Sequence, residues 1–293
     1  MSVYAAIKDN RFLPIADLDE GFLRPTYEEQ IIVSYMQAGL VCDFINRHFG
    51  PDMLRELLFA FRDGLPTETA IETTIDMPTT EFDTAFAQFV DQELGSVLAQ
   101  LDEWHEGQLA IKKELAAGAW DEVIAHAERL IAIIPQYSET DSPYIALAHA
   151  HTELGDPLSA LAALETYWHN GGYDPTTLQQ LSRWLIDAKR NDDAIAVMQS
   201  INLVDPLDGD LHGDLGDLLL ATDRAAEALQ EYQVALSLQP HDMATAWYRL
   251  ASAEHKLGNV EQSQNHLLQA LDVAPNYRPA QRLLLQLAAD ATD

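Results

Sequence analysis

Three prolines in the C-terminal third of the chain mark a regular period. Pro206, Pro240 and Pro275 lie 34 and 35 residues apart (240 − 206 and 275 − 240). Each closes a stretch with the same order of small and large apolar residues. A period near 34 residues is typical of a solenoid of stacked helical hairpins. The sequence therefore predicts an all-α fold, and such a solenoid more often offers a binding surface than a catalytic centre.

The residue types within each period fit the packing of paired helices. Where two helices of a hairpin cross closely, the sequence has small residues, namely Ala148, Ser182, Gly216 and Ala251. Further along each unit, larger side chains would fill the space to the next hairpin, namely Leu164, Met198, Tyr232 and Leu267. Proline cannot continue a helix, so the three prolines should follow the second helix of each pair. Asp174-Pro175 and Ser142-Pro143 each read as an N-cap followed by a first-turn proline.

These residues and their spacing resemble tetratricopeptide repeats. The resemblance covers about residues 104–277 and is strongest in the last two units. It is weaker toward residue 104, where Ile111 replaces a small residue. The resemblance implies a superhelix of about five hairpins within residues 98–293. Residues 278–291 would form the terminal capping helix that such arrays need.

In tetratricopeptide arrays, one face of each first helix lines a concave groove that binds a peptide or protein segment. By position, the resemblance implies a partner-binding groove lined by Ile145, His149, Thr152, Gln179, Arg183, Ile186, Asp210, Asp217, Tyr248, Ser252, His255 and Lys256. This set is polar and lacks the two-lysine clamp with which chaperone-binding arrays hold a terminal carboxylate. A C-terminal carboxylate ligand is therefore disfavoured. The alternative is that each of these residues is solvated surface.

The chain is strongly acidic, with 47 Asp and Glu against 17 Lys and Arg and a formal net charge of −30. The excess is spread over the whole sequence and is not a tail. It argues against nucleic acid and against anionic membrane surfaces as partners. Two interpretations stay open. One is solubility or adaptation to a salty habitat, and the other is a protein or peptide partner of basic character.

Cysteine content and hydropathy limit the chain further. Cys42 is the only cysteine, so an internal disulfide and a cysteine-based metal site are excluded. We expect Cys42 to be a small buried residue on a helix. Apolar runs stay shorter than a bilayer-spanning helix needs, and Met1 to Lys8 does not have the pattern of a signal peptide. The chain is therefore expected in the cytoplasm if Met1 is the true start, whereas a longer parent could be exported.

Residues 1–97 predict a small helical domain of a different kind. Thr26-Tyr27-Glu28-Glu29 has the pattern of a capping box and would open a helix that runs to about His48. Gly50-Pro51 breaks this helix, and further helices are expected over about 52–63, over 68–74 with Thr67 as cap, and after Pro78. The last of these carries an apolar stripe that should be core, formed by Phe82, Phe86, Phe89 and Val90.

The order of segments from Val33 to Phe89 resembles the C-terminal helical part of gluzincin metallopeptidases, the peptidase MA-like group. It includes Val33-Ser34-Tyr35-Met36-Gln37-Ala38-Gly39, then Phe49-Gly50 and a helix from Leu54 to Phe61. In these enzymes a tyrosine in a similar setting donates a hydrogen bond to the oxyanion of the reaction intermediate. The resemblance gives that role to Tyr35, but only where a zinc-binding half exists. Otherwise Tyr35 is expected to be a core tyrosine.

The zinc-binding half of such an enzyme is missing from the sequence. A His-Glu-x-x-His helix supplies two zinc ligands and a general base, and no such pattern occurs. His105-Glu106 is followed by Leu109 where the second histidine should stand. Phosphate-binding glycine loops and nucleophile elbows are also absent from the sequence, and the ten histidines lack ligand spacing. We therefore expect no catalytic activity, no metal and no cofactor in this chain.

Three hypotheses of function follow. The first is a scaffold whose groove binds a protein or peptide segment. The second is the C-terminal fragment of a zinc metallopeptidase whose His-Glu-x-x-His half lies upstream of Met1. The third is a solenoid that forms homo-oligomers through an exposed helix face.

Overall fold

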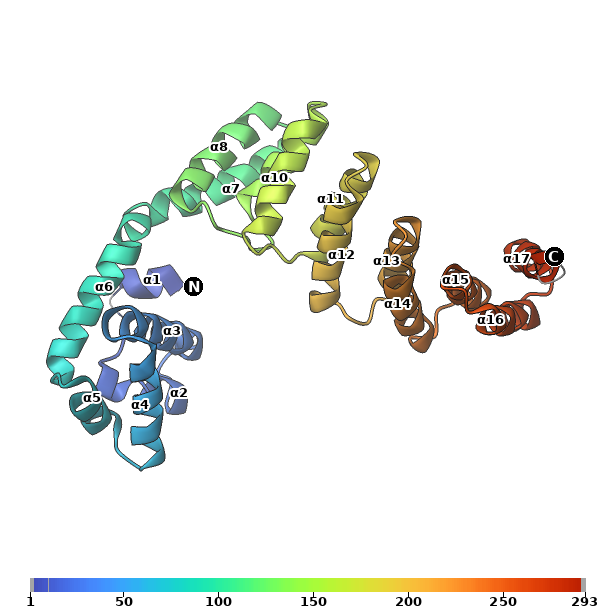
Figure 1. Cartoon of the computed structure of the whole chain (residues 1–293). Coiled ribbons are helices and arrows are strands. Elements are labelled where there is room, and N and C mark those ends of the chain that lie inside the picture. Colours follow the sequence, from blue (N-terminus) through green and yellow to red (C-terminus); the bar gives the residue numbers. More distant parts are fainter. Residues whose placement is uncertain (1–2, 10, 291–293) are drawn as a thin grey trace. The chain divides into compact units, whose positions relative to one another are not determined.

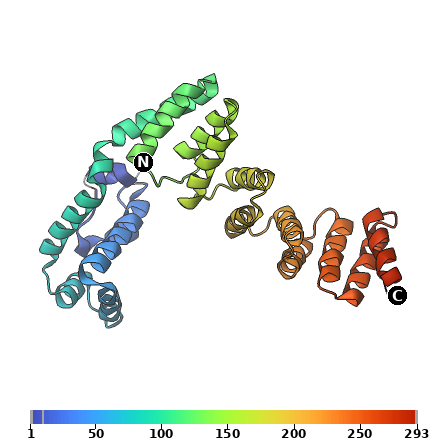
Figure 2. The same ribbon diagram turned by 45° about the horizontal axis from the view of Figure 1, so that its top comes forward.

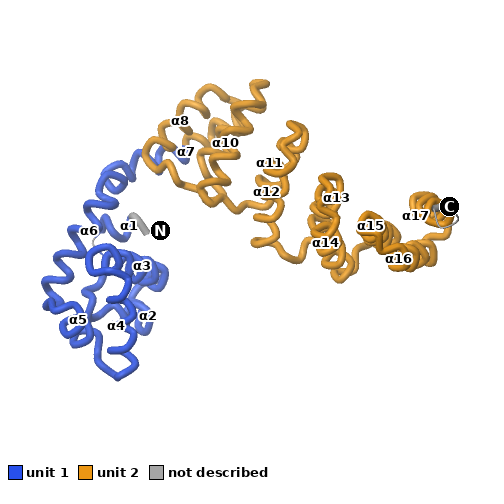
Figure 3. The backbone as a smooth tube through the Cα atoms, in the orientation of Figure 1, with its two compact units in different colours: residues 1–109 blue, residues 110–293 orange. Residues whose placement is uncertain are grey.

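The computed structural model describes residues 3–9 and 11–290, and in this part of the chain every regular element is a helix (Figure 1). The chain divides into two compact units, Met1–Leu109 (unit 1) and Ala110–Asp293 (unit 2) (Figure 3). The division falls inside helix α7 (Leu101–Ala117). The sequence had suggested a boundary between residues 97 and 98.

Unit 1 is a helical domain without a repeat. Its elements before α7 are α1 (Val3–Lys8), the 3-10 turn η1 (Ile15–Asp17), α2 (Glu20–Leu23), α3 (Gln30–Phe49), α4 (Pro51–Arg62), α5 (Thr67–Ile75) and α6 (Thr79–Ala99). The single residue Gly50 joins α3 to α4. It can do so because its φ of +89° suits glycine, while Pro51 begins α4 without needing an N–H partner.

Aromatic rings fill the core of unit 1. Phe44 of α3 is buried, and its ring lies 5.2, 5.9 and 5.4 Å from those of Phe82, Phe86 and Phe89 on α6. Val90 is buried beside them. The apolar stripe expected after Pro78 is therefore confirmed as core.

The sequence placed two helix starts in unit 1 incorrectly. The expected capping box does not form, because α3 begins at Gln30 and the Thr26 hydroxyl donates to the Gln30 side-chain oxygen at 2.9 Å. The Gln30 side chain thus stabilises a turn over residues 26–29, and this turn precedes the helix. Thr67 is the first residue of α5 and not its cap, and Pro66 occupies the N-cap position without a side-chain bond.

Two residues of α3 expected in the core lie at the surface. The Tyr35 side chain is 68% exposed and makes an edge-on ring contact with Phe22 at 4.9 Å. Cys42 lies on a helix as expected, but it is exposed. Both expectations failed because α3 faces the Phe82–Phe89 core only through residues such as Val41, Phe44 and Ile45.

Unit 2 stacks helical hairpins in chain order, as the two views of the ribbon show (Figures 1 and 2). The hairpins are residues 110–117 of α7 with α8 (Trp120–Ile133), α9 (Pro143–Glu153) with α10 (Pro157–His169), α11 (Pro175–Asp187) with α12 (Asn191–Val204), α13 (Gly209–Ala221) with α14 (Ala225–Ser237), and α15 (Met243–Lys256) with α16 (Val260–Val273). The chain then forms α17 (Arg278–Asp290), which packs on α16 in the place of the expected capping helix. The predicted all-α superhelix of five hairpins is confirmed.

The small-to-large pairing of the repeats has a direct geometric cause. A Cβ atom on Gly216 would lie 2.3 Å from the Tyr232 ring, so only glycine lets α13 and α14 approach this closely. In the last hairpin, the Ser263 hydroxyl donates to the Ala251 carbonyl at 2.8 Å in a buried crossing. The four small positions are buried, and so are Leu164, Met198, Tyr232 and Leu267.

Helix ends in unit 2 follow the local sequence closely. Asp174 accepts a hydrogen bond from the Thr177 backbone N–H at 2.8 Å, and Ser142 accepts one from Tyr144 at 3.3 Å, as the N-cap prediction required. Asp156, Asp208 and Asp242 cap α10, α13 and α15 in the same way. Part of the acidity of the chain therefore serves helix capping.

The turn inside each hairpin needs a left-handed backbone. Gly155 and Gly258 have φ of +77° and +78° at this position. At the equivalent positions of the two hairpins between them, Lys189 and Asp223 adopt φ of +60° and +61°. The repeat architecture thus imposes a conformation that glycine accepts and lysine tolerates at a cost.

Candidate functional site

The predicted groove residues all lie on the first helices of four successive hairpins. α9 carries Ile145, His149 and Thr152, and α11 carries Gln179, Arg183 and Ile186. α13 carries Asp210 and Asp217, and α15 carries Tyr248, Ser252, His255 and Lys256. Each helix leaves these residues at least partly exposed. Because equivalent helices of adjacent hairpins are neighbours, the residues follow one another along the solenoid.

A cavity of about 610 Å³ opens between α11 and α13. Five of the predicted residues line it, namely Gln179, Arg183, Ile186, Asp210 and Asp217. The structure adds Asp208 and Asp214 to its wall, and the apolar floor includes Met198 and Leu218. The cavity is therefore a half-apolar depression with a carboxylate-rich side.

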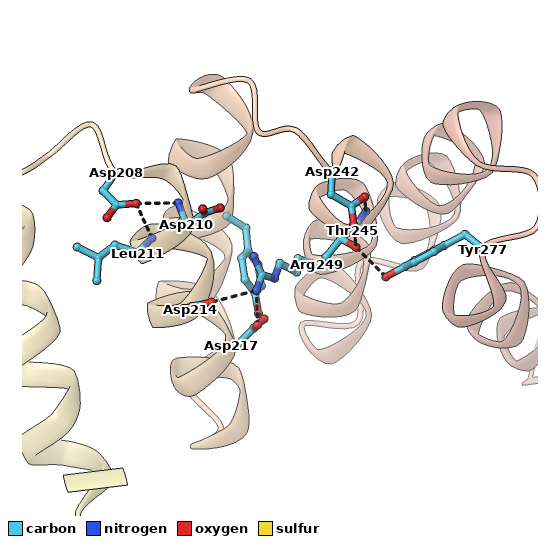
Figure 4. A network of polar contacts seen from close by, with 10 residues as sticks. Asp208, Asp210, Leu211, Asp214, Asp217, Asp242, Thr245, Arg249 and Tyr277 are labelled. Carbon is cyan, nitrogen blue, oxygen red and sulfur yellow. Dashed lines mark hydrogen bonds and ion pairs between the residues drawn. The ribbon is translucent and has the colours of Figure 1, made fainter. Parts of the chain in front are cut away.

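The acidic side of the cavity is one face of α13. Asp210, Asp214 and Asp217 stand at positions i, i+4 and i+7, which bring side chains to the same face of a helix (Figure 4). Partial removal from water raises the pKa of Asp214; Arg249 opposes this shift, and the neighbouring Asp217 and Asp210 charges add to it. The three carboxylates thus form a region where a positive charge would be stabilised.

Arg249 of α15 reaches across to this acidic face. Its guanidinium donates to Asp217 at 2.6 Å and to Asp214 at 3.4 Å (Figure 4). A Cβ atom on Gly213 would lie 2.1 Å from the same guanidinium, so the absence of a side chain there makes room for the arginine. Burial lowers the pKa of Arg249, but the hydrogen bond to Asp217 and the charges of Asp217 and Asp214 together outweigh burial, and the net shift is upward.

Asp217 also connects the groove to the core of its own hairpin. The hydroxyl group of the buried Tyr232 on α14 donates a hydrogen bond to the Asp217 carboxylate at 2.8 Å. Burial and the Asp217 charge raise the pKa of Tyr232, so the phenol stays protonated at neutral pH. Asp217 is thereby held between a tyrosine hydroxyl and a guanidinium and has a fixed position.

The Asp210 side chain, in contrast, is exposed to solvent at the N-terminal end of α13, with only its backbone N–H held by Asp208 at 3.1 Å. Arg183 stands across the cavity on α11 and forms no ion pair among the described residues. Asp210 and Arg183 are therefore the charged groups of the cavity that a ligand reaches most directly.

The remaining predicted residues lie outside this cavity. The His149 ring contacts Trp120 edge-on at 5.2 Å, and Tyr248 contacts Tyr277 of the segment before α17 at 5.7 Å. Lys256 pairs with Asp223 at 3.3 Å, and Ser252 donates to the Tyr248 carbonyl of its own helix. They continue the first-helix face on both sides of the cavity.

Sequence reasoning missed Asp214, Arg249 and Gly213. A signal was present, because Asp214 and Arg249 lie 35 residues apart, which is one repeat period. Equivalent positions of adjacent repeats face each other, so opposite charges at that spacing predict an ion pair between hairpins. Gly213 carries no such signal, since its role depends on where the guanidinium lies.

Two further observations concern metals and membranes. In the described part of the chain, no three His, Cys, Asp or Glu side chains gather closely enough to hold a metal ion. Among the helices of residues 3–9 and 11–290, none has the length and hydropathy that a membrane crossing requires.

Residues 244–277 match the tetratricopeptide repeat family. This segment is the last hairpin with its connection to α17, where the sequence resemblance was strongest. The fold of unit 2 is that of a tetratricopeptide array. Curated protein sequences show no significant match to the chain.

Solved structures with a similar arrangement include two that are described as tetratricopeptide repeat structures. YrrB, described as having an unusual peptide-binding site, is 15% identical with a TM-score of 0.45, over 59% of this chain and 87% of YrrB. MamA from Desulfovibrio magneticus RS-1 is 21% identical with a TM-score of 0.44, over 51% of this chain and 84% of that structure. The first repeat domain of Spaghetti (RPAP3), solved with an HSP90 peptide, is 18% identical with a TM-score of 0.38, over 41% of this chain and 98% of that structure.

Proposed function

We propose that this chain is a non-catalytic scaffold that binds an extended protein or peptide segment along the first-helix face of unit 2. The observation that carries the proposal is the cavity between α11 and α13, which is about 610 Å³ and lined by five predicted groove residues. Its size lies within the range of small-ligand sites and suits one or two side chains of a bound segment. The proposed segment passes over this cavity and continues toward Tyr248 and His255.

The proposed ligand carries a basic side chain opposite α13. A lysine or arginine entering the cavity would meet the exposed carboxylate of Asp210 and the carboxyl group of Asp214, whose pKa is raised. A cation favours the charged form of a carboxyl group, so the basic segment and ionised Asp214 stabilise each other. The net charge of −30 also favours the approach of a basic partner over long distances.

The test is a peptide library presented to the full chain, with Lys, Gln or Glu scanned through each position and affinity measured by fluorescence anisotropy. The expected result is a preference for lysine at one position. That preference should weaken in Asp210→Asn and persist in Asp272→Asn, which changes an exposed carboxylate on the second helix α16. The affinity should also fall as pH drops, since protonation of Asp214 removes its charge.

A second set of variants tests the groove without reference to charge. Truncating a central aromatic such as Tyr248 should cost about 2 kcal/mol or more of binding free energy if it is a hot spot. Replacing Tyr248, Arg183 and His255 together should abolish binding. Unchanged affinity in that triple variant would place the ligand elsewhere and contradict the proposal.

We keep the metallopeptidase hypothesis for a longer parent as a second proposal, which rests on the order of segments from Val33 to Phe89. Tyr35, which the resemblance assigns to the oxyanion, lies on the surface of unit 1 and is accessible from outside. Reading the genomic sequence upstream of Met1 for a His-Glu-x-x-His helix tests this hypothesis. For the chain itself, zinc content and hydrolysis of a generic peptide library are the tests, and stoichiometric zinc with turnover would contradict the scaffold proposal.

A further inference from the structure

Unit 1 has an apolar groove that the proposed function does not use. The groove, of about 520 Å³, lies between α3 and α4, and the η1–α2 segment and α5 contribute further lining residues. Its walls include Ala38 and Cys42 on α3 and Leu54, Leu58 and Phe61 on α4. Leu58 is 67% exposed and Phe61 is also exposed, so the groove leaves large apolar side chains in water. We name this surface the α3–α4 groove.

The spacing of its walls fits a helix. The lining residues of α3 stand at 38, 41, 42 and 45, and those of α4 stand at 54, 57, 58 and 61. Both rows have the i, i+3, i+4, i+7 pattern over two helical turns. Val41, Ile45 and Leu57 are buried and form the floor, and the other five members are at least partly exposed. Side chains of a third helix with the same spacing interdigitate with two such rows. An amphipathic helix is therefore the shape that covers this groove best.

Charge selects among the possible helices. Residues 1–100 contain six basic and 17 acidic side chains. All six basic side chains already form ion pairs within the chain, namely Lys8–Asp102, Arg11–Asp9, Arg24–Glu20, Arg47–Asp43, Arg55–Asp52 and Arg62–Asp63. The field around unit 1 is therefore negative, and Asp19 contributes a carboxylate to the groove wall itself.

The same field disfavours two other occupants. A second copy of this chain would bring a further net charge of −30, and like charges repel. An anionic lipid surface is repelled for the same reason. A helix with basic residues flanking its apolar face is attracted, because electrostatic complementarity steers the partner and excludes wrong ones.

We propose that the α3–α4 groove binds the apolar face of an amphipathic helix whose polar face is basic, supplied by a partner protein. This site lies in unit 1 and is independent of the segment-binding groove in unit 2. The two proposals therefore fail or succeed separately, because each is tested with variants in its own unit.

Cys42 provides a reporter within the α3–α4 groove, since it is exposed there and is the only cysteine of the chain. The full chain is reacted with a thiol reagent such as DTNB in the presence of designed 16-residue helices. These share one apolar face and carry basic, neutral or acidic polar faces, and a scrambled basic peptide removes the apolar face. The basic helix should slow the reaction by about tenfold or more at saturation, and the acidic and scrambled peptides should not.

A matched pair of variants locates the binding surface. Leu58→Asp places a charge in the groove, and Leu158→Asp does the same at a leucine of α10 that is 78% exposed. Because both side chains are in water, both variants should fold, which far-UV circular dichroism checks. The affinity for the basic helix should fall at least about tenfold in Leu58→Asp, the loss typical of a hot spot, and stay unchanged in Leu158→Asp. Asp19→Asn should weaken it several-fold.

Several results would overturn this proposal. Equal affinity for basic and acidic helices would contradict the role of charge. Full affinity in Leu58→Asp would show that the helix does not bind at the α3–α4 groove. Failure of every helix in the panel to protect Cys42 would exclude an amphipathic helix as the ligand of the groove. Concentration-dependent protection of Cys42 without peptide, with a doubled mass in light scattering, assigns the groove to a second copy. Protection by anionic vesicles alone assigns it to a membrane.

Discussion

The two units bury apolar surface in different ways. In unit 1 large rings from distant segments meet around Phe44, and each element contributes different residues. In unit 2 the last four hairpins share one arrangement, in which the first helix has a small residue where the second has a large one, as Gly216 faces Tyr232. A mutation in the ring core of unit 1 should therefore destabilise the whole unit. A mutation in unit 2 should destabilise mainly its own hairpin and the neighbouring ones.

The exposed surfaces of the two units also differ, in their polarity. The α3–α4 groove of unit 1 is almost entirely apolar, while the cavity between α11 and α13 has a row of carboxylates. Both surfaces lie in an acidic chain, so charge favours basic partners in each. The comparison teaches that one net charge can serve two kinds of recognition, one led by apolar contact and one by ion pairing.

The largest expected effect tests the ring core of unit 1. Phe44→Ala removes a buried ring that contacts three others, and such changes cost about 3–5 kcal/mol. Hydrogen exchange measured by mass spectrometry should show lost protection across α3 to α6, with α11 to α16 unchanged. If protection falls equally in both units, they are one cooperative body and the contrast drawn above is wrong.

A smaller effect tests the close crossing in unit 2. Gly216→Ala should destabilise the protein by about 1–3 kcal/mol, because the new methyl group overpacks against the Tyr232 ring. Urea denaturation followed by circular dichroism measures it. The control is Gly39→Ala on α3, where a Cβ atom meets nothing within 4 Å. That change should be neutral or stabilising by up to about 1 kcal/mol through helix propensity. Equal effects at both sites would refute the steric argument.

The smallest effect concerns the N-cap of α15. Asp242→Ala removes hydrogen bonds to the Thr245 backbone N–H and hydroxyl, at a cost of about 1 kcal/mol at pH 7. The backbone hydrogen bond from Thr245 holds the pKa of Asp242 below its usual range. Since the folded pKa is the lower one, this stability is fully present above the unfolded pKa of about 3.9 and is lost as pH falls below it.

Thermal or urea unfolding of wild type and Asp242→Ala from pH 7 to pH 3 checks this prediction. The difference between the two proteins should shrink at acid pH. Asp272→Asn, which changes an exposed carboxylate one residue before the end of α16, should stay within about 0.5 kcal/mol of wild type throughout. A difference at pH 3 as large as that at pH 7 would mean that Asp242 stabilises α15 through something other than its charge.

The sequence alone determined the architecture of unit 2. Its period, its small and large positions and its helix-ending prolines each act over one hairpin and its neighbours. Pro206, Pro240 and Pro275 follow α12, α14 and α16, and Asp174 caps α11 as expected. Local chemistry suffices there because every contact that fixes the fold recurs at a short and constant separation.

Only the tertiary structure decided where Arg249, Tyr35 and Cys42 lie. Arg249 crosses to Asp217 because Gly213 leaves room, and Gly213 shows no sign of this in the sequence. Tyr35 and Cys42 sit on a helix whose core face is set by rings up to about 50 residues away, so an apolar neighbourhood in sequence did not imply burial. Non-repeating contacts depend on the whole chain, and local patterns do not encode them.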